Sequence, residues 1–166
     1  IGYKNASNLG GIIGKKLGPF FRSNTKIHEN LKNAQIGNSH DDRNNLINSM
    51  WCNYGKILSE YIFLKKFRKK NLNKFVEIEG LNILHDIKRN NDQVVFVSGH
   101  FNNFELMAMH IEKSGIDLAA VYRPLNNKFL NPLMEKIRRK YICKKQIKKG
   151  ISGTKELLSY FKNGSS

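Results

Sequence analysis

His100 and Glu105 are two residues of this 166-residue chain whose types and spacing could support acid–base chemistry. They belong to the stretch 94–105, which reads Val-Val-Phe-Val-Ser-Gly-His-Phe-Asn-Asn-Phe-Glu. Its four apolar residues at 94–97 are typical of a strand buried on both faces, and the Ser-Gly pair that follows favours a turn. Asn102, a good N-cap residue, precedes Glu105 by three positions and predicts the start of a helix. We therefore expect strand, turn and helix, with His100 exposed at the turn.

This arrangement predicts a general base with an orienting partner. Residues five apart do not share a face of a continuous helix, but a turn ahead of the helix would let the side chains of His100 and Glu105 meet. A neutral imidazole could then take a proton from a substrate hydroxyl while the carboxylate fixes its tautomer. The alternative is structural, with Glu105 in a capping box and His100 an ordinary turn residue. Spacing alone favours that alternative.

Arg123 is the third candidate, because it lies just after the next apolar segment, residues 116–121, which is expected to be a strand. Strand, helix and strand in this order predict a right-handed parallel crossover, which would place Arg123 at the same sheet edge as His100. A guanidinium there suits a phosphate or a developing oxyanion. The alternative is a surface arginine at the end of a strand.

Three landmarks resemble the bacterial lipid A biosynthesis acyltransferases, the late lauroyl and myristoyl transferases. The run 98–106 resembles their first motif, His, four residues, then Asp or Glu, with Phe104 where Trp is more usual. The segment 121–124, Val-Tyr-Arg-Pro, looks like the family's Tyr-Arg-Pro strand end. The segment 50–55, Met-Trp-Cys-Asn-Tyr-Gly, resembles with Glu60 its upstream helix. The landmarks stand in the family's order, and the resemblance runs from Leu9 to about Gly164.

The resemblance implies an α/β fold like that of glycerol-phosphate acyltransferases, with a mixed sheet flanked by helices. Residues 1–166 would form a single partial domain, truncated at its C-terminal side, with a helical part over about 1–72 and the catalytic core from about 75 onward. The chain starts at Ile rather than Met, which is expected of a fragment. A membrane anchor is expected in the missing N-terminal segment, with the protein at the cytoplasmic face of the inner membrane.

The resemblance also implies a reaction. A fatty acyl chain would pass from acyl carrier protein to a hydroxyl of a phosphorylated lipid A precursor, by direct attack on the thioester. His100 would be the general base, Glu105 its partner and Arg123 a substrate-binding residue. No metal and no cofactor is expected beyond the phosphopantetheine of the carrier. A related lipid acyltransferase, with glycerol phosphate or a phosphatidylinositol mannoside as acceptor, is the nearest alternative.

The charge of the chain predicts anionic partners. Lys and Arg number 29 and Asp and Glu 13, which gives a net charge of +16, and basic clusters occupy 65–70 and 136–149. They suit a membrane surface, lipid phosphates or an acidic carrier protein, although solvated surface and a codon bias toward Lys are the plainer alternatives. A nucleic-acid-binding module is an alternative of another class, but the clusters lack the interleaved aromatic residues of a stacking platform, and no nucleic acid is expected.

Apolar periodicity predicts the remaining elements. An apolar stripe recurs at three- and four-residue spacing from Leu46 to Ile62 and predicts the clearest amphipathic helix, capped by Ser39 or Asp41. Further helices are expected over 1–21, where glycines weaken the pattern, and over 79–90, 102–114, 131–141 and 153–162, and a short strand over 75–78. Cys52 and Cys143 have no metal-like spacing and indicate a reduced cytosolic setting. No run of about 18 apolar residues occurs.

Overall fold

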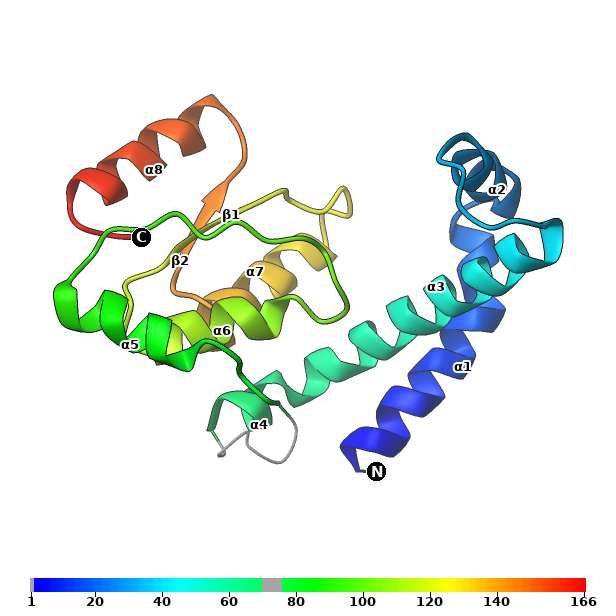
Figure 1. Ribbon diagram of the computed structural model, residues 1–166, viewed down its shortest axis with the longest axis horizontal. Helices are drawn as coiled ribbons and strands as arrows, with labels where there is room; N and C mark the ends of the chain where they lie inside the picture. The colour runs from blue at the N-terminus through cyan, green and yellow to red at the C-terminus, as the bar shows by residue number, and fades with distance from the viewer. Residues whose placement is uncertain (1, 70–75) are drawn as a thin grey trace. The chain divides into compact units, whose positions relative to one another are not determined.

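The computed structural model describes residues 2–69 and 76–166, which form two compact units, Ile1–Leu64 and Lys65–Ser166 (Figure 1). The first unit is helical and contains α1 (Tyr3–Phe21), α2 (Asn24–Asn33), α3 (His40–Glu60) and the 3-10 turn η1 (Tyr61–Phe63). The helix α4 (Leu64–Lys69) leads into the second unit, which contains α5 (Leu81–Asn90), α6 (Glu105–Lys113), β1 (Ala119–Tyr122), α7 (Leu130–Tyr141), β2 (Lys145–Lys148) and α8 (Ile151–Lys162).

Glycines allow α1 and α3 to pack in very close contact. A Cβ built on Gly55 would lie 2.0 Å from the carbonyl oxygen of Gly10, and one built on Gly14 would lie 2.3 Å from the carbonyl oxygen of Trp51. No side chain fits at such distances, so the two backbones touch directly. The glycines that weaken α1 as an isolated helix are therefore the residues that let tertiary packing hold it.

Polar contacts fix both ends of α3. At its start the side chains and backbone amides of Ser39 and Asp42 form a capping box, each hydrogen bond being 3.0 Å. At its end the buried Glu60 carboxylate accepts a hydrogen bond of 2.9 Å from Ser7 on α1. The expected amphipathic helix and its Ser39 cap are thus confirmed.

The second unit contains a small parallel sheet. β1 pairs with β2 in the register Ala119 to Lys145 through Tyr122 to Lys148, and α7 is the crossover between them. Lys149 extends the ladder by donating its N–H to the carbonyl of Tyr122 at 2.8 Å. The buried apolar side chains of the unit include Met109, Ile111, Ile116, Ile142 and Ile147. Helices packed with a parallel sheet agree with the α/β class, whereas the glycerol-phosphate-acyltransferase-like mixed sheet stays a prediction.

The strands predicted at 94–97 and 75–78 differ from the structure, and one strand of the structure, β2, was not predicted. Residues 94–97 are extended but join no strand ladder in the described part of the chain, and Val95 and Val97 are 79% and 91% exposed. An apolar run becomes a strand only when a neighbouring edge pairs with it, and among the residues that the structure describes no strand edge pairs with this run. β2 was not predicted, because its Lys-Gln-Ile-Lys sequence lies within the basic run. The strand expected at 75–78 falls partly outside the described residues, and 76–78 has no regular structure.

Arg68 of α4 fastens two other helices of the unit. Its guanidinium donates to the carbonyls of Tyr141 and Ile142, at 3.2 and 3.3 Å, where α7 ends. It also forms an ion pair with Glu112 of α6. The last carbonyls of a helix lack partners within the helix, so Arg68 satisfies groups that α7 cannot satisfy itself.

No helix among residues 2–69 and 76–166 has the length and apolar character needed to cross a bilayer.

The close contact of α1 and α3 gives a first prediction. Gly55→Ala should lower the free energy of unfolding by on the order of 1–3 kcal/mol through overpacking, even though alanine is the better helix former. Asn5→Ala, at an exposed position of α1, is the control and should change stability by less than about 0.5 kcal/mol. Trp51, the single tryptophan, reports the transition by fluorescence during urea unfolding. A Gly55→Ala protein as stable as the parent would show that the two backbones can separate without cost.

Candidate functional site

His100 lies in an irregular turn just ahead of α6. Asn102 in this turn has a φ of 47°, in the left-handed region, and its carbonyl accepts a hydrogen bond of 3.1 Å from the N–H of Phe104. Phe104 then occupies the N-cap position and Glu105 is the first residue of the helix. The predicted capping box of Asn102 and Glu105 is therefore wrong, because an N-cap residue needs an extended backbone that Asn102 does not adopt. The predicted end of the helix at Ser114-Gly115 is correct.

The three predicted site residues line one cavity of about 460 Å³. His100 comes from the turn, Glu105 from the start of α6, and Arg123 from the residue after β1. The carboxyl end of a strand and the start of a helix thus meet at one place, as is usual for sites in α/β proteins. Tyr122 of β1 and Arg138 of α7 also line the cavity.

The His100 ring is exposed and packs against Phe104. The two ring centroids are 4.4 Å apart and the rings are tilted by 56°. This contact sets the position of the imidazole at the mouth of the cavity and leaves it accessible to a substrate.

Glu105 is buried and paired with Arg138. Nε and Nη2 of Arg138 lie 2.7 and 2.6 Å from Oε1 of Glu105, and the two side chains are only 15% and 6% exposed. Two charge-assisted contacts on one oxygen make this a tight ion pair. The structure therefore brings Glu105 into the same cavity as His100 but pairs its carboxylate with Arg138 rather than with the imidazole.

The ring of Tyr122 lies against the guanidinium of Arg138. Its ring centroid lies 5.8 Å from the guanidinium carbon of Arg138, a cation–π arrangement. Burial, and then the neighbouring Glu135 carboxylate, raise the pKa of Tyr122 to about 12. Its hydroxyl therefore stays protonated at neutral pH.

Arg138 is the site residue that sequence reasoning missed. It belongs to the basic run 136–149, whose composition predicts a surface or docking charge. Its spacing in the sequence could have identified it. Arg138 follows Met134 by four residues and precedes Tyr141 by three, so it lies on the same face of α7 as these apolar residues. An arginine on an inward stripe needs a buried anion, and Glu105 is that anion.

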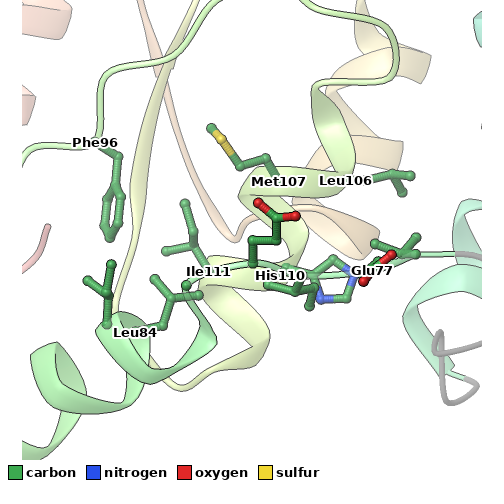
Figure 2. Close-up of a pocket in the computed structure, with 12 residues that line it drawn as sticks. Glu77, Leu84, Phe96, Leu106, Met107, His110 and Ile111 are labelled. Carbon is green, nitrogen blue, oxygen red and sulfur yellow. The ribbon is translucent and has the colours of Figure 1, made fainter.

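A second cavity, of about 430 Å³, is lined by residues of α5 and α6 together with the segment 76–80 and Phe96 (Figure 2). Its wall is mostly apolar, and the side chains labelled in Figure 2 are Glu77, Leu84, Phe96, Leu106, Met107, His110 and Ile111. Burial, and then the charge of Lys113, lower the pKa of His110, so its imidazole is neutral at pH 7. Within the described part of the chain, no cluster of three His, Cys, Asp or Glu side chains could hold a metal ion.

The buried pair gives a second prediction. Glu105→Gln or Arg138→Gln alone should each lower the free energy of unfolding by about 3–5 kcal/mol, because each leaves one buried charge without its partner. The double variant should lose less than the sum of the two. Urea unfolding of the four proteins measures the coupling. Arg89→Gln is the control, because the Arg89–Asp86 pair is 75% and 54% exposed and should contribute at most about 1 kcal/mol. Additive losses in the double variant would contradict the pairing.

Comparison with known proteins agrees with the landmarks. The family model described as bacterial lipid A biosynthesis acyltransferase matches residues 1–166. No curated protein and no solved structure was found to match the chain. The family expected from the residues around His100, Arg123 and Trp51 is thereby confirmed: the chain belongs to the bacterial lipid A biosynthesis acyltransferase family.

Proposed function

We propose that this protein transfers a fatty acyl chain from acyl carrier protein to a hydroxyl group of a lipid A precursor, with His100 as general base. The observation that carries the proposal is the common cavity of His100, Glu105 and Arg123. Membership of the family gives the acyltransferase class. The donor, the acceptor and the roles of the residues are the proposed part.

In the proposed reaction the acceptor hydroxyl attacks the thioester carbon directly. The imidazole of His100 takes the hydroxyl proton as the new C–O bond forms. The tetrahedral intermediate then collapses, the C–S bond breaks, and the imidazolium returns the proton to the leaving thiolate. The products are an ester and the free thiol of the carrier, so no acyl-enzyme forms. The exposed position of the His100 ring supports this role.

Glu105 would act on His100 as a fixed negative charge. Its ion pair with Arg138 holds the carboxylate immobile in the cavity wall. A fixed anion in a partly buried cavity stabilises an imidazolium as it forms, without moving during the reaction.

Arg123 would hold a phosphate of the acceptor lipid or of the carrier's phosphopantetheine. It is exposed at the end of β1, where a guanidinium can offer two parallel donors to phosphate oxygens. Arg138, by contrast, is engaged by Glu105. Arg123 is therefore the arginine of this cavity that we assign to substrate.

The exposed part of the basic run would receive the acidic carrier or the membrane surface. Several of its cations bond within the fold: Arg139 pairs with Glu135 at 3.2 Å and Lys145 pairs with Asp117. Lys136, Lys144 and Lys149 are exposed. We place the docking of an anionic partner on these residues, at the membrane surface where a lipid acceptor resides.

The third prediction concerns His100. His100→Ala should reduce transfer of radiolabelled acyl chain from acyl carrier protein to lipid A precursor by about 10²–10⁴-fold, the usual effect of losing a general base. His85→Ala, on the exposed face of α5, is the matched control and should retain full activity. Circular dichroism checks that both variants are folded. Turnover close to the parent in a folded His100→Ala protein would rule out the mechanism.

The fourth prediction concerns Arg123. If it holds a phosphate in ground and transition state alike, Arg123→Ala raises KM and spares kcat. Arg123→Lys should recover only part of the loss, since it keeps the charge but not the paired donors. A fall in kcat, equivalent to roughly 2.7–4 kcal/mol of barrier, would instead assign Arg123 to the oxyanion. Arg89→Ala is the control, and two unchanged constants in Arg123→Ala would make Arg123 an ordinary surface residue.

A further inference from the structure

The short helix α2 is held against α3 by a small set of side chains (Figure 1). Ile27 is the buried apolar residue of α2, and the indole of Trp51 donates a hydrogen bond of 3.2 Å to the side chain of Asn24 where α2 begins. Two imidazoles supply the next contact. The ring of His28 on α2 stacks on the ring of His40, the first residue of α3, with centroids 4.7 Å apart and an interplanar angle of 9°.

Asn44 joins the two imidazoles through its amide group. Its Oδ1 lies 2.8 Å from Nε2 of His28, and its Nδ2 lies 3.1 Å from Nδ1 of His40. An amide oxygen only accepts hydrogen bonds and an amide nitrogen only donates them. Nε2 of His28 therefore carries a proton, whereas Nδ1 of His40 does not.

Nδ1 of His28 has no suitable place for a proton. This nitrogen is buried and has no hydrogen-bond partner among the residues that the structure describes. A proton on it would make a buried donor without an acceptor, which is costly because the same group in water would be hydrogen-bonded. The network therefore favours a neutral His28 with its proton on Nε2.

A proton on Nδ1 of His40 would also break the network, because it would face the donor Nδ2 of Asn44. A flip of the Asn44 amide would restore that contact, but it would turn Nδ2 toward Nε2 of His28 and force the proton of His28 onto its buried Nδ1. Two charged imidazoles in stacked contact would repel each other. A charged His40 would in addition place a positive charge in the first turn of α3, against the helix dipole.

The charged side chains around the two imidazoles do not offset these costs. Six of them lie within four residues of His28 or His40 along α2 and α3, and they are three cations and three anions: Lys26, Lys32, Arg43, Glu29, Asp41 and Asp42. Asp42 accepts from the N–H of Ser39 in the capping box, and Arg43 donates to the carbonyl of Gly37 at 2.8 Å. Among residues 2–69 and 76–166, neither imidazole forms an ion pair with a carboxylate.

We propose that His28, Asn44 and His40 form a pH-sensitive latch, which holds α2 on α3 while both imidazoles are neutral and releases it when either one takes up a proton. Histidine changes its charge between about pH 5 and 8. Because the latched form excludes the extra proton, its stability is present above that range and is lost as the pH falls through it. The inference concerns the helical unit and stands whether or not the proposed reaction is correct.

Hydrogen exchange of the α2 amides at pH 8 and pH 5 tests the latch. Protection factors are compared, so that the intrinsic pH dependence of exchange cancels. Protection of amides 28–34 should fall by about tenfold or more at pH 5 relative to that of the α6 amides, the effect of losing a buried hydrogen bond. Nitrogen NMR shifts at pH 8 should show His28 protonated at Nε2 alone.

Asn44→Asp should reverse the pH dependence. A carboxylate accepts from both imidazoles and favours their protonated forms, so α2 should be better protected at pH 5 than at pH 8 in this variant. His85→Gln, which changes an exposed histidine of α5, is the matched control and should keep the pH dependence of the parent.

Equal protection of α2 at the two pH values in the parent protein would overturn the proposal, and so would an Asn44→Asp protein that still loses protection at pH 5. A proton on Nδ1 of His28 at pH 8 would contradict the network itself. Equal loss of protection throughout α1, α2 and α3 would assign the pH dependence to the whole helical unit and also overturn the latch. The parent series and the NMR measurement decide the matter if Asn44→Asp does not fold.

Discussion

The ion pair between Glu105 and Arg138 is the interaction on which the site depends. Burying two charges costs desolvation free energy that their attraction only partly returns, so such a pair contributes more to geometry than to stability. Here it fixes the first residue of α6 to the last turn of α7, the crossover helix of the sheet. The position of the turn that carries His100 is therefore tied to the position of the strands. Both partners line the cavity, so the pair joins two of the helices that form its wall.

Much of the fold could be predicted from the sequence, because its helices carry periodic apolar stripes. The stripe from Leu46 to Ile62 and the cap at Ser39 gave α3, and similar patterns gave α5 and α8. The site residues could be named for a different reason. His100, Glu105 and Arg123 stand in short motifs at the ends of elements, and the ends of neighbouring elements meet in α/β proteins.

The remaining features depend on tertiary contacts that periodicity does not show. The run at 94–97 has the composition of a strand, but pairing requires an edge, and no strand edge in the described part of the chain pairs with it. β2 has a polar sequence, yet its Gln146 is buried because its amide donates to the carbonyl of Cys143 at 3.1 Å. Asn102 adopts the left-handed conformation where its type and spacing indicated a cap. Each case is settled by a partner distant in space or by a single backbone angle.

The contacts of Arg68 have a consequence for motion. Helices usually fray from their ends, and the last turn opens at small cost. In α7 that turn is held by Arg68, which also holds Glu112 of α6. Opening of the C-terminal turn of α7 must therefore release α4 and α6 as well. Helix α7, which carries Arg138, is therefore expected to open together with α4 and α6 rather than to fray by itself. Brief local fluctuations of its last turn then leave the Glu105–Arg138 ion pair in place.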